Sequence, residues 1–445
     1  MASTSRREFF GRVGALAATP VMAACGGTAA DSGSSGALKL STQPVTLRMN
    51  VRAGGDEALW KFFQPQLKEK LPHVTVEAEG FPGDFTGYLQ KVTAVAASGS
   101  LGDVIYSTTT SGLFDVLHSA KLLRPVDDLV RADKYDLKVF YRPGVDLLTR
   151  EGNLYGLPNT CQPGSVVLYF NKSMLERDGA VLPNPDWTPE DALTSARRVA
   201  KPGSDIWGYG LATDANGILA MVQSFGGRWL SKDGKKAEVN SPGTRQALTY
   251  MSDLIQRHKV SPPPGAVNGG NIMGLLTGKV GMFIGSTSDA TRLQTQTDVE
   301  VGTSLIPRVR KDLPRGIMRV DGYSITTNSK YPREAWDAIK VAMGPEGSVA
   351  REAVPGGSGT LGCTPAAWTN AEVLKKRGAM QQMYVHVLGE SEVNIMANNY
   401  RNDEYLQAIT SRMDPVWKGE AQVTDGLMQD MQQAAQLILD KPKNG

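Results

Sequence analysis

The chain has 445 residues and a formal net charge of +3, which falls to +1 when three arginines and one glutamate of residues 1–24 are removed. A balance this close to neutral, without a run of basic residues, excludes the electrostatic footprint of a nucleic-acid-binding protein. Roughly 400 residues beyond the N-terminus exceed what one hydrophobic core organises, so we expect two lobes.

The N-terminus carries the pattern of an export signal that ends at a lipidation site. Ser5-Arg6-Arg7-Glu8-Phe9-Phe10 places paired arginines before two aromatic residues, as twin-arginine signals do, and an apolar run follows at 13–22. About 10 apolar residues are too few to span a hydrocarbon core, which takes about 20 as a helix. The small residues before Cys25 resemble a lipoprotein cleavage site. We expect removal of residues 1–24, acylation of Cys25 and work outside the cytoplasm, anchored to the cell membrane.

Regular structure is predicted to begin after a flexible tether at 25–42, which is rich in glycine and serine. Residues 45–51 alternate apolar and polar side chains, which predicts a strand, and 56–70 carry apolar residues at helical spacing. The next predicted elements are a strand at 73–78, a helix at 88–98 and a strand at 103–106. This alternation over about 60 residues is typical of an open α/β fold with a mainly parallel sheet.

A second α/β unit follows without an obvious linker. Residues 165–170 form a predicted strand, and Thr188 begins a helix with a favourable cap, a proline and acidic residues in the first turn. A proline-rich break at 261–265 separates this helix region from further predicted strands at 278–285 and 322–327. Two α/β units in one chain support the expectation of two lobes.

The sequence contains no recognisable catalytic, metal-binding or cofactor-binding motif. The four histidines and three cysteines fit no zinc spacing, and Val280 stands where a phosphate loop needs Ser or Thr. Residues 357–362 match a dinucleotide fingerprint but lack the flanking strand and acidic residue, so a turn-rich loop is expected. The pair Asp127-Asp128 follows a proline and favours a helix start over glycoside hydrolysis. We therefore expect neither enzymatic activity nor a cofactor.

Several short stretches share their order and spacing with a known family. They are Tyr88 to Val104, Gly152-Asn153-Leu154-Tyr155-Gly156-Leu157-Pro158, 168–172, 187–193, 278–282 and 328–336. Over residues 45–439 the chain therefore resembles the extracellular solute-binding proteins of bacterial ABC importers, in the branch that includes maltose-binding proteins. One departure is Gly102, where the family usually has proline.

The resemblance implies a two-lobed periplasmic-binding-protein fold of the class II type, with a hinge and a ligand cleft between the lobes. It implies an N-terminal lobe at 43–157 and 285–345, and a C-terminal lobe at 158–284 and 346–445. The expected function is capture of a carbohydrate by a monomer through lobe closure, with delivery to an ABC permease. A role in sensing, a glycerol-phosphate-type or other polar solute, and a glycan-cleaving surface enzyme are the alternatives.

Candidate ligand contacts stand where predicted strands end and where the family places its cleft. Those before the first crossing between lobes are Phe81, Asp84, Ser107, Thr109 and Ser111. The later ones are Asn159, Gln162, Asn216, Trp229, Ser286, Ser288, Asp289, Asp321, Gly322, Asn399 and Tyr400. Hydroxyl and amide groups suit sugar hydroxyls, and aromatic rings stack on sugar faces. The predominance of small side chains favours a mono- or disaccharide.

Two of these residues have an equally physical alternative. Asp84 stands where it would cap a helix, and Trp229 follows a glycine pair where it would pack a hairpin. An anionic solute would require arginines, and only Arg52 and Arg228 are evident near the expected cleft. That scarcity disfavours a phosphate-bearing ligand.

Two cysteines remain once Cys25 is assigned to lipid. The family layout brings Cys161 and Cys363 to the same side of the cleft base, and an oxidising compartment permits a bond between them. The alternatives are one disulfide and two separate buried thiols.

Overall fold

The structure of the chain is a computed structural model. It describes residues 39–82, 85–109, 112–286, 289–294, 298–355, 361–377, 387–388, 390–393, 395–399 and 401–442. The expected signal peptide, Cys25 and most of the tether lie outside this range, as do the candidate contacts Asp84, Ser111, Ser288 and Tyr400.

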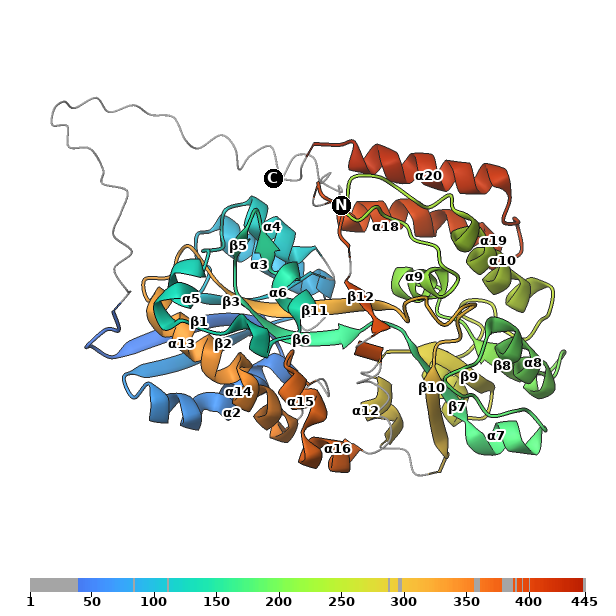
Figure 1. The fold of residues 1–445 in the computed structure, drawn as a ribbon, viewed down its shortest axis with the longest axis horizontal. Coiled ribbons are helices and arrows are strands. Elements are labelled where there is room, and N and C mark those ends of the chain that lie inside the picture. The colour runs from blue at the N-terminus through green and yellow to red at the C-terminus, as the bar shows by residue number, and fades with distance from the viewer. Residues whose placement is uncertain are drawn as a thin grey trace, which may run out of the picture.

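A six-stranded sheet forms the centre of the first lobe (Figure 1). Its order is β12 (Glu392–Val393), β11 (Ile317–Ile325), β3 (Val104–Thr108), β1 (Val45–Arg52) and β2 (Val74–Phe81), and β6 (Leu157–Pro163) also pairs with β11. Strand β1 runs parallel to β2 and β3, while β11 runs antiparallel to β3 and β6. The predicted alternation of strands and helices in the first 60 residues of the fold is confirmed.

The helices of the first lobe bury the apolar stripes that their sequences carry. In α2 (Gly55–Lys70) the side chains of Leu59, Phe63 and Leu67 are buried, and the Trp60 ring meets the Tyr323 ring edge-on with centroids 5.1 Å apart. Helices α6 (Arg142–Leu147) and α13 (Pro332–Met343) pack against both β6 and β11. The further helices are α3 (Phe85–Ala97), α4 (Leu113–Ser119), α5 (Asp127–Asp133), α14 (Pro345–Ala350), α15 (Pro365–Thr369) and α16 (Ala371–Arg377).

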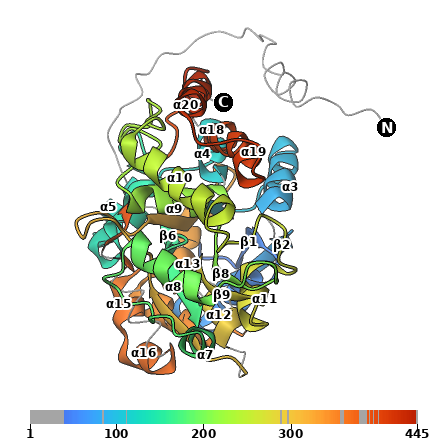
Figure 2. The same ribbon diagram turned by 90° about the vertical axis from the view of Figure 1, so that its right-hand side faces the viewer.

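A four-stranded sheet forms the centre of the second lobe, which Figure 2 views from the side of α8 and α10. Its order is β10 (Val301–Leu305), β7 (Val167–Asn171), β9 (Val280–Gly285) and β8 (Trp207–Gly210). Strands β8 and β9 are parallel, and β7 is antiparallel to both β9 and β10. The helices are α7 (Lys172–Arg177), α8 (Pro189–Val199), α9 (Ala215–Ser224), α10 (Pro242–Gln256), α11 (Gly270–Leu276), α12 (Asp289–Gln294), α18 (Asn402–Thr410), α19 (Asp414–Trp417) and α20 (Asp425–Leu439).

Local capping signals in the sequence are confirmed. The Thr188 side chain accepts a hydrogen bond from the Asp191 amide, and Asp191 accepts one in return from the Thr188 amide, which together form a capping box. Thr364 likewise caps α15 by accepting from the amide of Ala367. Asp127 begins α5, as expected of a carboxylate at a helix N-terminus.

The predicted lobe boundaries are wrong in several places. Strands β6 and β12 were expected in the second lobe, but both pair with β11 in the first sheet. Strand β10 was expected in the N-terminal lobe, but it pairs with β7 in the second sheet. Helices α14 and α15 were expected in the second lobe, but α14 packs between α13 and α15 beside the first sheet (Figure 1). A β-bridge between Thr160 and Gly362 ties the residues just before α15 to β6. These errors concern pairings between distant segments, which periodicity does not report.

The segments that cross between the sheets lie side by side. Residues 164–166 join β6 to β7, and residues 306–316 join β10 to β11. The amide of Ile306 donates to the Val166 carbonyl at 2.9 Å, and the amide of Glu392 donates to the Gly316 carbonyl at 2.9 Å. Gly316 has φ +124°, and a Cβ there would lie 2.0 Å from Val166 Cγ1, so this position requires glycine.

Candidate functional site

The carboxyl ends of strands from both sheets approach each other at the crossing segments. Strand β6 ends at Pro163, and β7 begins at Val167, which pairs with Gly285 at the end of β9. Three residues therefore separate the end of β6 from the carboxyl edge of the second sheet. Ligands of open α/β sheets bind outside the carboxyl ends of strands. We call the ends of β1, β3, β6, β8 and β9, with the first half of β11, the interlobe site.

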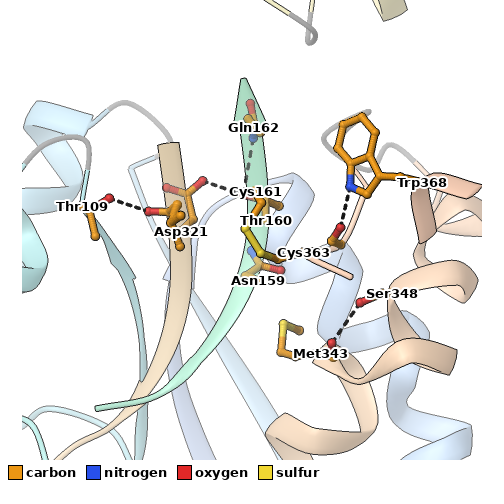
Figure 3. The surroundings of a disulfide bond; sticks show 12 residues. Thr109, Asn159, Thr160, Cys161, Gln162, Asp321, Met343, Ser348, Cys363 and Trp368 are labelled. Atoms are coloured by element: carbon orange, nitrogen blue, oxygen red, sulfur yellow. Dashed lines mark hydrogen bonds between the residues drawn. A yellow bond between two sulfur atoms is a disulfide. The ribbon is translucent and has the colours of Figure 1, made fainter. Parts of the chain in front are cut away.

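A row of polar groups crosses β3, β11 and β6 at this edge (Figure 3). The Thr160 hydroxyl donates to Asp321 Oδ2 at 3.1 Å, and the Gln162 amide donates to Thr160 Oγ1 at 3.4 Å. Asp321 is 9% exposed and Gln162 is half-buried. On the other side of β11, the Thr109 hydroxyl and amide both donate to the Val320 carbonyl, at 3.0 and 3.1 Å. Among the predicted contacts, the structure brings Thr109, Gln162 and Asp321 together.

A charged cluster stands behind this row at the end of β1. Arg52 Nε donates to Asp56 Oδ2 at 2.7 Å, and its guanidinium lies 4.4 Å from the centroid of the Tyr106 ring. The Tyr323 hydroxyl donates to the other oxygen of Asp56 at 3.3 Å. Burial opposes the charge of Arg52, but Tyr106, Asp56 and Asp321 outweigh it and raise its pKa. Burial raises the pKa of Asp56, and the neighbouring Arg52 partly offsets that effect.

Asn159 supports β6 from within the fold. Arg351 Nη1 donates to Asn159 Oδ1 at 2.6 Å and to its carbonyl at 3.0 Å, and both residues are buried. The pairing of β6 with β11 shifts register at this point, between Asp321 and Gly322. The guanidinium therefore satisfies polar groups that the irregular pairing leaves without a strand partner.

Cys161 and Cys363 form a disulfide with their Cα atoms 4.6 Å apart (Figure 3). The structure thus contains the first of the two alternatives that the sequence left open. Both cysteines are fully buried, and Cys161 stands between Thr160 and Gln162 on β6. The disulfide consequently fixes the strand that carries two members of the polar row.

The second lobe contributes the ends of β8 and β9. Asn216 is half-buried in the first turn of α9, and its backbone amide donates to Asp214 Oδ1 at 2.9 Å. Beyond β9, the amide and hydroxyl of Ser286 donate to Asp289 Oδ2 at 2.7 and 3.1 Å. Ser286 and Asp289 are both partly exposed.

Several predicted contacts are interior residues instead. Phe81 is 2% exposed and packs against Tyr88, with ring centroids 6.0 Å apart. The buried Ser107 hydroxyl bonds to the Gly322 carbonyl at 3.3 Å, and Thr109 is also fully buried. Gly322 makes room for the Leu148 side chain of the lobe itself, since a Cβ would lie 2.6 Å from Leu148 Cδ1. Phe81, Ser107 and Gly322 therefore shape the lobe rather than line the site, and the buried Thr109 belongs to the polar row only through its bonds to the Val320 carbonyl.

Trp229 and Asn399 hold the second lobe together. Trp229 is 2% exposed beside the bridge between Leu230 and Ala237, which is the hairpin packing that the sequence offered as an alternative. The Asn399 side chain donates to three carbonyls at the end of α20, those of Ile438, Leu439 and Lys441. Its position in the chain gave no indication of this capping role.

Sequence reasoning missed Asp56, Arg319 and Arg351. The strand around Asp321 was predicted to begin at 322, whereas β11 begins at Ile317. The alternation of Met318 and Val320, both buried, with the half-buried Arg319 was the available signal. Within the described ranges, no group of three His, Cys, Asp or Glu side chains is arranged to hold a metal ion. None of the helices in that part of the chain has the length and apolar character of a membrane span.

Two α/β lobes, crossing segments that lie side by side and polar residues at the strand ends next to them are features of the class of two-lobed solute receptors. The chain belongs to the bacterial extracellular solute-binding protein family, whose pattern it matches over residues 52–349. The members of this family and its structural neighbours are binding proteins.

Solved structures of low sequence identity share the fold. The cyclic alpha-maltosyl-1,6-maltose binding protein of Arthrobacter globiformis superimposes with a TM-score of 0.75 at 18% identity, over 90% of this chain and 100% of that one. UgpB from Mycobacterium tuberculosis, in complex with glycerophosphocholine, gives a TM-score of 0.73 at 15% identity, over 90% and 99%. The lactose-binding protein of Rhizobium radiobacter is 28% identical over 178 residues, which are 37% of this chain and 39% of that protein.

Proposed function

We propose that the protein is a lipid-anchored extracytoplasmic receptor that captures a carbohydrate at the interlobe site and delivers it to an ABC permease. The observation that carries this proposal is the polar row at the ends of β6 and β11, which lies next to the crossing segments and the end of β9. The similarity to proteins named for lactose and for a cyclic maltose oligosaccharide supports a carbohydrate as the solute.

The proposed ligand contacts come from both lobes. Gln162 and Asp321 act from the first lobe, and Asn216, Ser286 and Asp289 act from the second. Carboxylates and amides accept from and donate to sugar hydroxyls, and a closed site without water strengthens each such bond. Asp84, Ser111, Ser288 and Tyr400 complete the proposed set. These short side chains suit a mono- or disaccharide.

Lobe closure requires a hinge, and the crossing segments supply it. Their mutual hydrogen bonds keep them together, while Gly316 gives the start of β11 a backbone conformation that other residues rarely adopt. Rotation about a few such residues would bring the two sets of contacts onto one ligand. We expect a monomer that shrinks measurably in X-ray scattering when its sugar binds.

A thermal-shift screen of the purified protein tests the proposal directly. The panel should contain neutral mono- and disaccharides, cyclic oligosaccharides and glycerophosphocholine. A bound solute at 100 times its dissociation constant stabilises the fold by about 2.7 kcal/mol. Stabilisation by a sugar supports carbohydrate capture. Stabilisation by glycerophosphocholine alone favours the alternative of another polar solute, which the structural similarity to UgpB supports. Turnover of a labelled oligosaccharide would instead indicate a glycan-cleaving enzyme.

A further inference from the structure

Arg319 is a cation of the interlobe site that lacks a protein partner. It lies on β11 directly opposite Gln162 of β6, on the same strand face as Asp321 two residues later. The side chain is half-buried, and its Nε atom is buried without a hydrogen-bond partner. Within the part of the chain that the structure describes, its guanidinium forms neither a hydrogen bond nor an ion pair.

The other guanidinium groups near the crossings are engaged by protein acceptors. Arg52 binds Asp56, and Arg351 binds Asn159 through two bonds. Arg315 donates to the Glu390 carboxylate at 2.5 Å and to two backbone carbonyls. Leaving a buried charged donor unsatisfied costs more than the roughly 1 to 3 kcal/mol of a neutral group. An unsatisfied donor at a binding site is explained when the ligand supplies the acceptor.

The charge of Arg319 gives the character of that acceptor. Among the described residues at the ends of β1, β6 and β11, Asp56 binds Arg52 and Asn159 binds Arg351. Arg319 is a cation of this group with which no described carboxylate pairs. Asp321 is occupied by the Thr160 hydroxyl and lies in the field of Arg52.

We propose that Arg319 binds an oxyanion on the solute, so that the receptor selects an acidic carbohydrate, a sugar that carries a carboxylate or a phosphate, over its neutral counterpart. This inference rests on the proposed function and narrows its substrate class. A planar guanidinium binds an oxyanion through two parallel hydrogen bonds, and Gln162, a further polar residue of the site, is the cross-strand neighbour of Arg319. It revises the expectation that too few arginines stand near the site for an anionic ligand.

Calorimetry with matched sugar pairs tests this selectivity. Glucose is compared with glucuronate and glucose 1-phosphate, galactose with galacturonate, and lactose with lactobionate. A charged hydrogen bond of about 1.5 to 3 kcal/mol corresponds to roughly 10- to 100-fold tighter binding of the acidic member. The carboxylate and phosphate pairs also show which of the two oxyanions the site prefers.

Two substitutions at Arg319 and one elsewhere assign the effect. Arg319→Gln should abolish the preference by weakening the acidic sugar about 10-fold or more, with little change for the neutral one. Arg319→Lys keeps the charge but not the geometry for two parallel hydrogen bonds. Its preference for the acidic sugar should lie between those of the parent protein and of Arg319→Gln. Arg257→Gln is the matched control, because Arg257 is exposed just after α10 of the second lobe, where its side chain lies 3.6 Å from Asp253. It should leave both affinities and the preference unchanged.

The outcomes separate this inference from the proposed function. Equal binding of neutral and acidic sugars by the parent protein, or an equal loss of both in Arg319→Gln, would overturn the role of Arg319 while carbohydrate capture stands. Failure of every sugar, neutral and acidic, would overturn carbohydrate capture and this inference with it. Circular dichroism melting of each variant in the absence of sugar shows that the fold is retained.

Discussion

Replacing both Cys161 and Cys363 by alanine should lower the free energy of unfolding substantially. The disulfide joins residues 202 positions apart. In the chain-entropy description, closing a loop of that length destabilises the unfolded state by about 5 kcal/mol at 25 °C. Native disulfides removed from other proteins cost about 2 to 5 kcal/mol, so we expect a loss in the upper half of that range. The double variant avoids a free thiol.

Packing adds to this effect. A Cβ at Gly144 of α6 would lie 2.5 Å from Cys363 Sγ and 2.8 Å from Cys161 Sγ, so this helix packs directly on the disulfide. Removing two buried sulfur atoms therefore also leaves a gap beneath α6. Because Cys161 is flanked by Thr160 and Gln162, the variant should in addition bind its solute more weakly.

Urea denaturation provides the assay, with circular dichroism as the probe and the parent protein measured in oxidised and reduced form. Reduction should destabilise the parent by somewhat less than the double substitution, because both sulfur atoms stay in place, and it should leave the double variant unchanged. The reasoning is refuted if the oxidised parent and the double variant agree within about 1 kcal/mol, the net worth of a single hydrogen bond. Two free thiols found in the parent by mass spectrometry would refute it as well.

Three further predictions concern the anchor, the site and a surface ion network. Cys25→Ala should move the protein from the membrane to the soluble fraction, because anchoring rests on the lipid chains, and retention after a salt wash would contradict lipidation. Gln162→Ala should weaken solute binding about 2- to 10-fold in calorimetry, the effect of losing one neutral hydrogen bond, and an unchanged affinity would remove this amide from the site. Partial burial acts to raise the pKa of Asp133, but hydrogen bonds from Lys340, Arg333 and a tryptophan outweigh it and lower that pKa. The ionised form thus stabilises the fold above the unfolded-state pKa, and this stabilisation is lost as the pH falls through the folded-state value. Asp133→Asn should therefore melt earlier than the parent at pH 7, with a gap that narrows toward pH 3, and a gap of constant size would contradict the role of the charge.

Local features of the fold were predictable from the sequence because neighbouring residues determine them. Strand β1 follows from alternation, the buried stripe of α2 from helical spacing, and the start of α8 from the Thr188 cap. The order of short motifs was sufficient for the family and for two lobes. These signals depend on residues a few positions apart, and long-range contacts did not override them.

Only the tertiary structure showed which segments pair across the chain. The placement of β10 in the second sheet depends on hydrogen bonds to β7, more than a hundred residues away in sequence. Trp229 and Asn399 carried plausible ligand chemistry, yet their burial against distant elements gives them internal roles.

The candidate site shows the same division. The sequence predicted that polar residues follow the strands, and Gln162 and Asp321 are two predicted contacts that lie together in the structure. The choice between a disulfide and two thiols, and the contrast between the engaged Arg52 and the unpartnered Arg319, depended on distances between remote segments. The sequence gives the chemical type of a side chain. Whether its charge is paired by another protein group depends on the distant residues that folding places next to it.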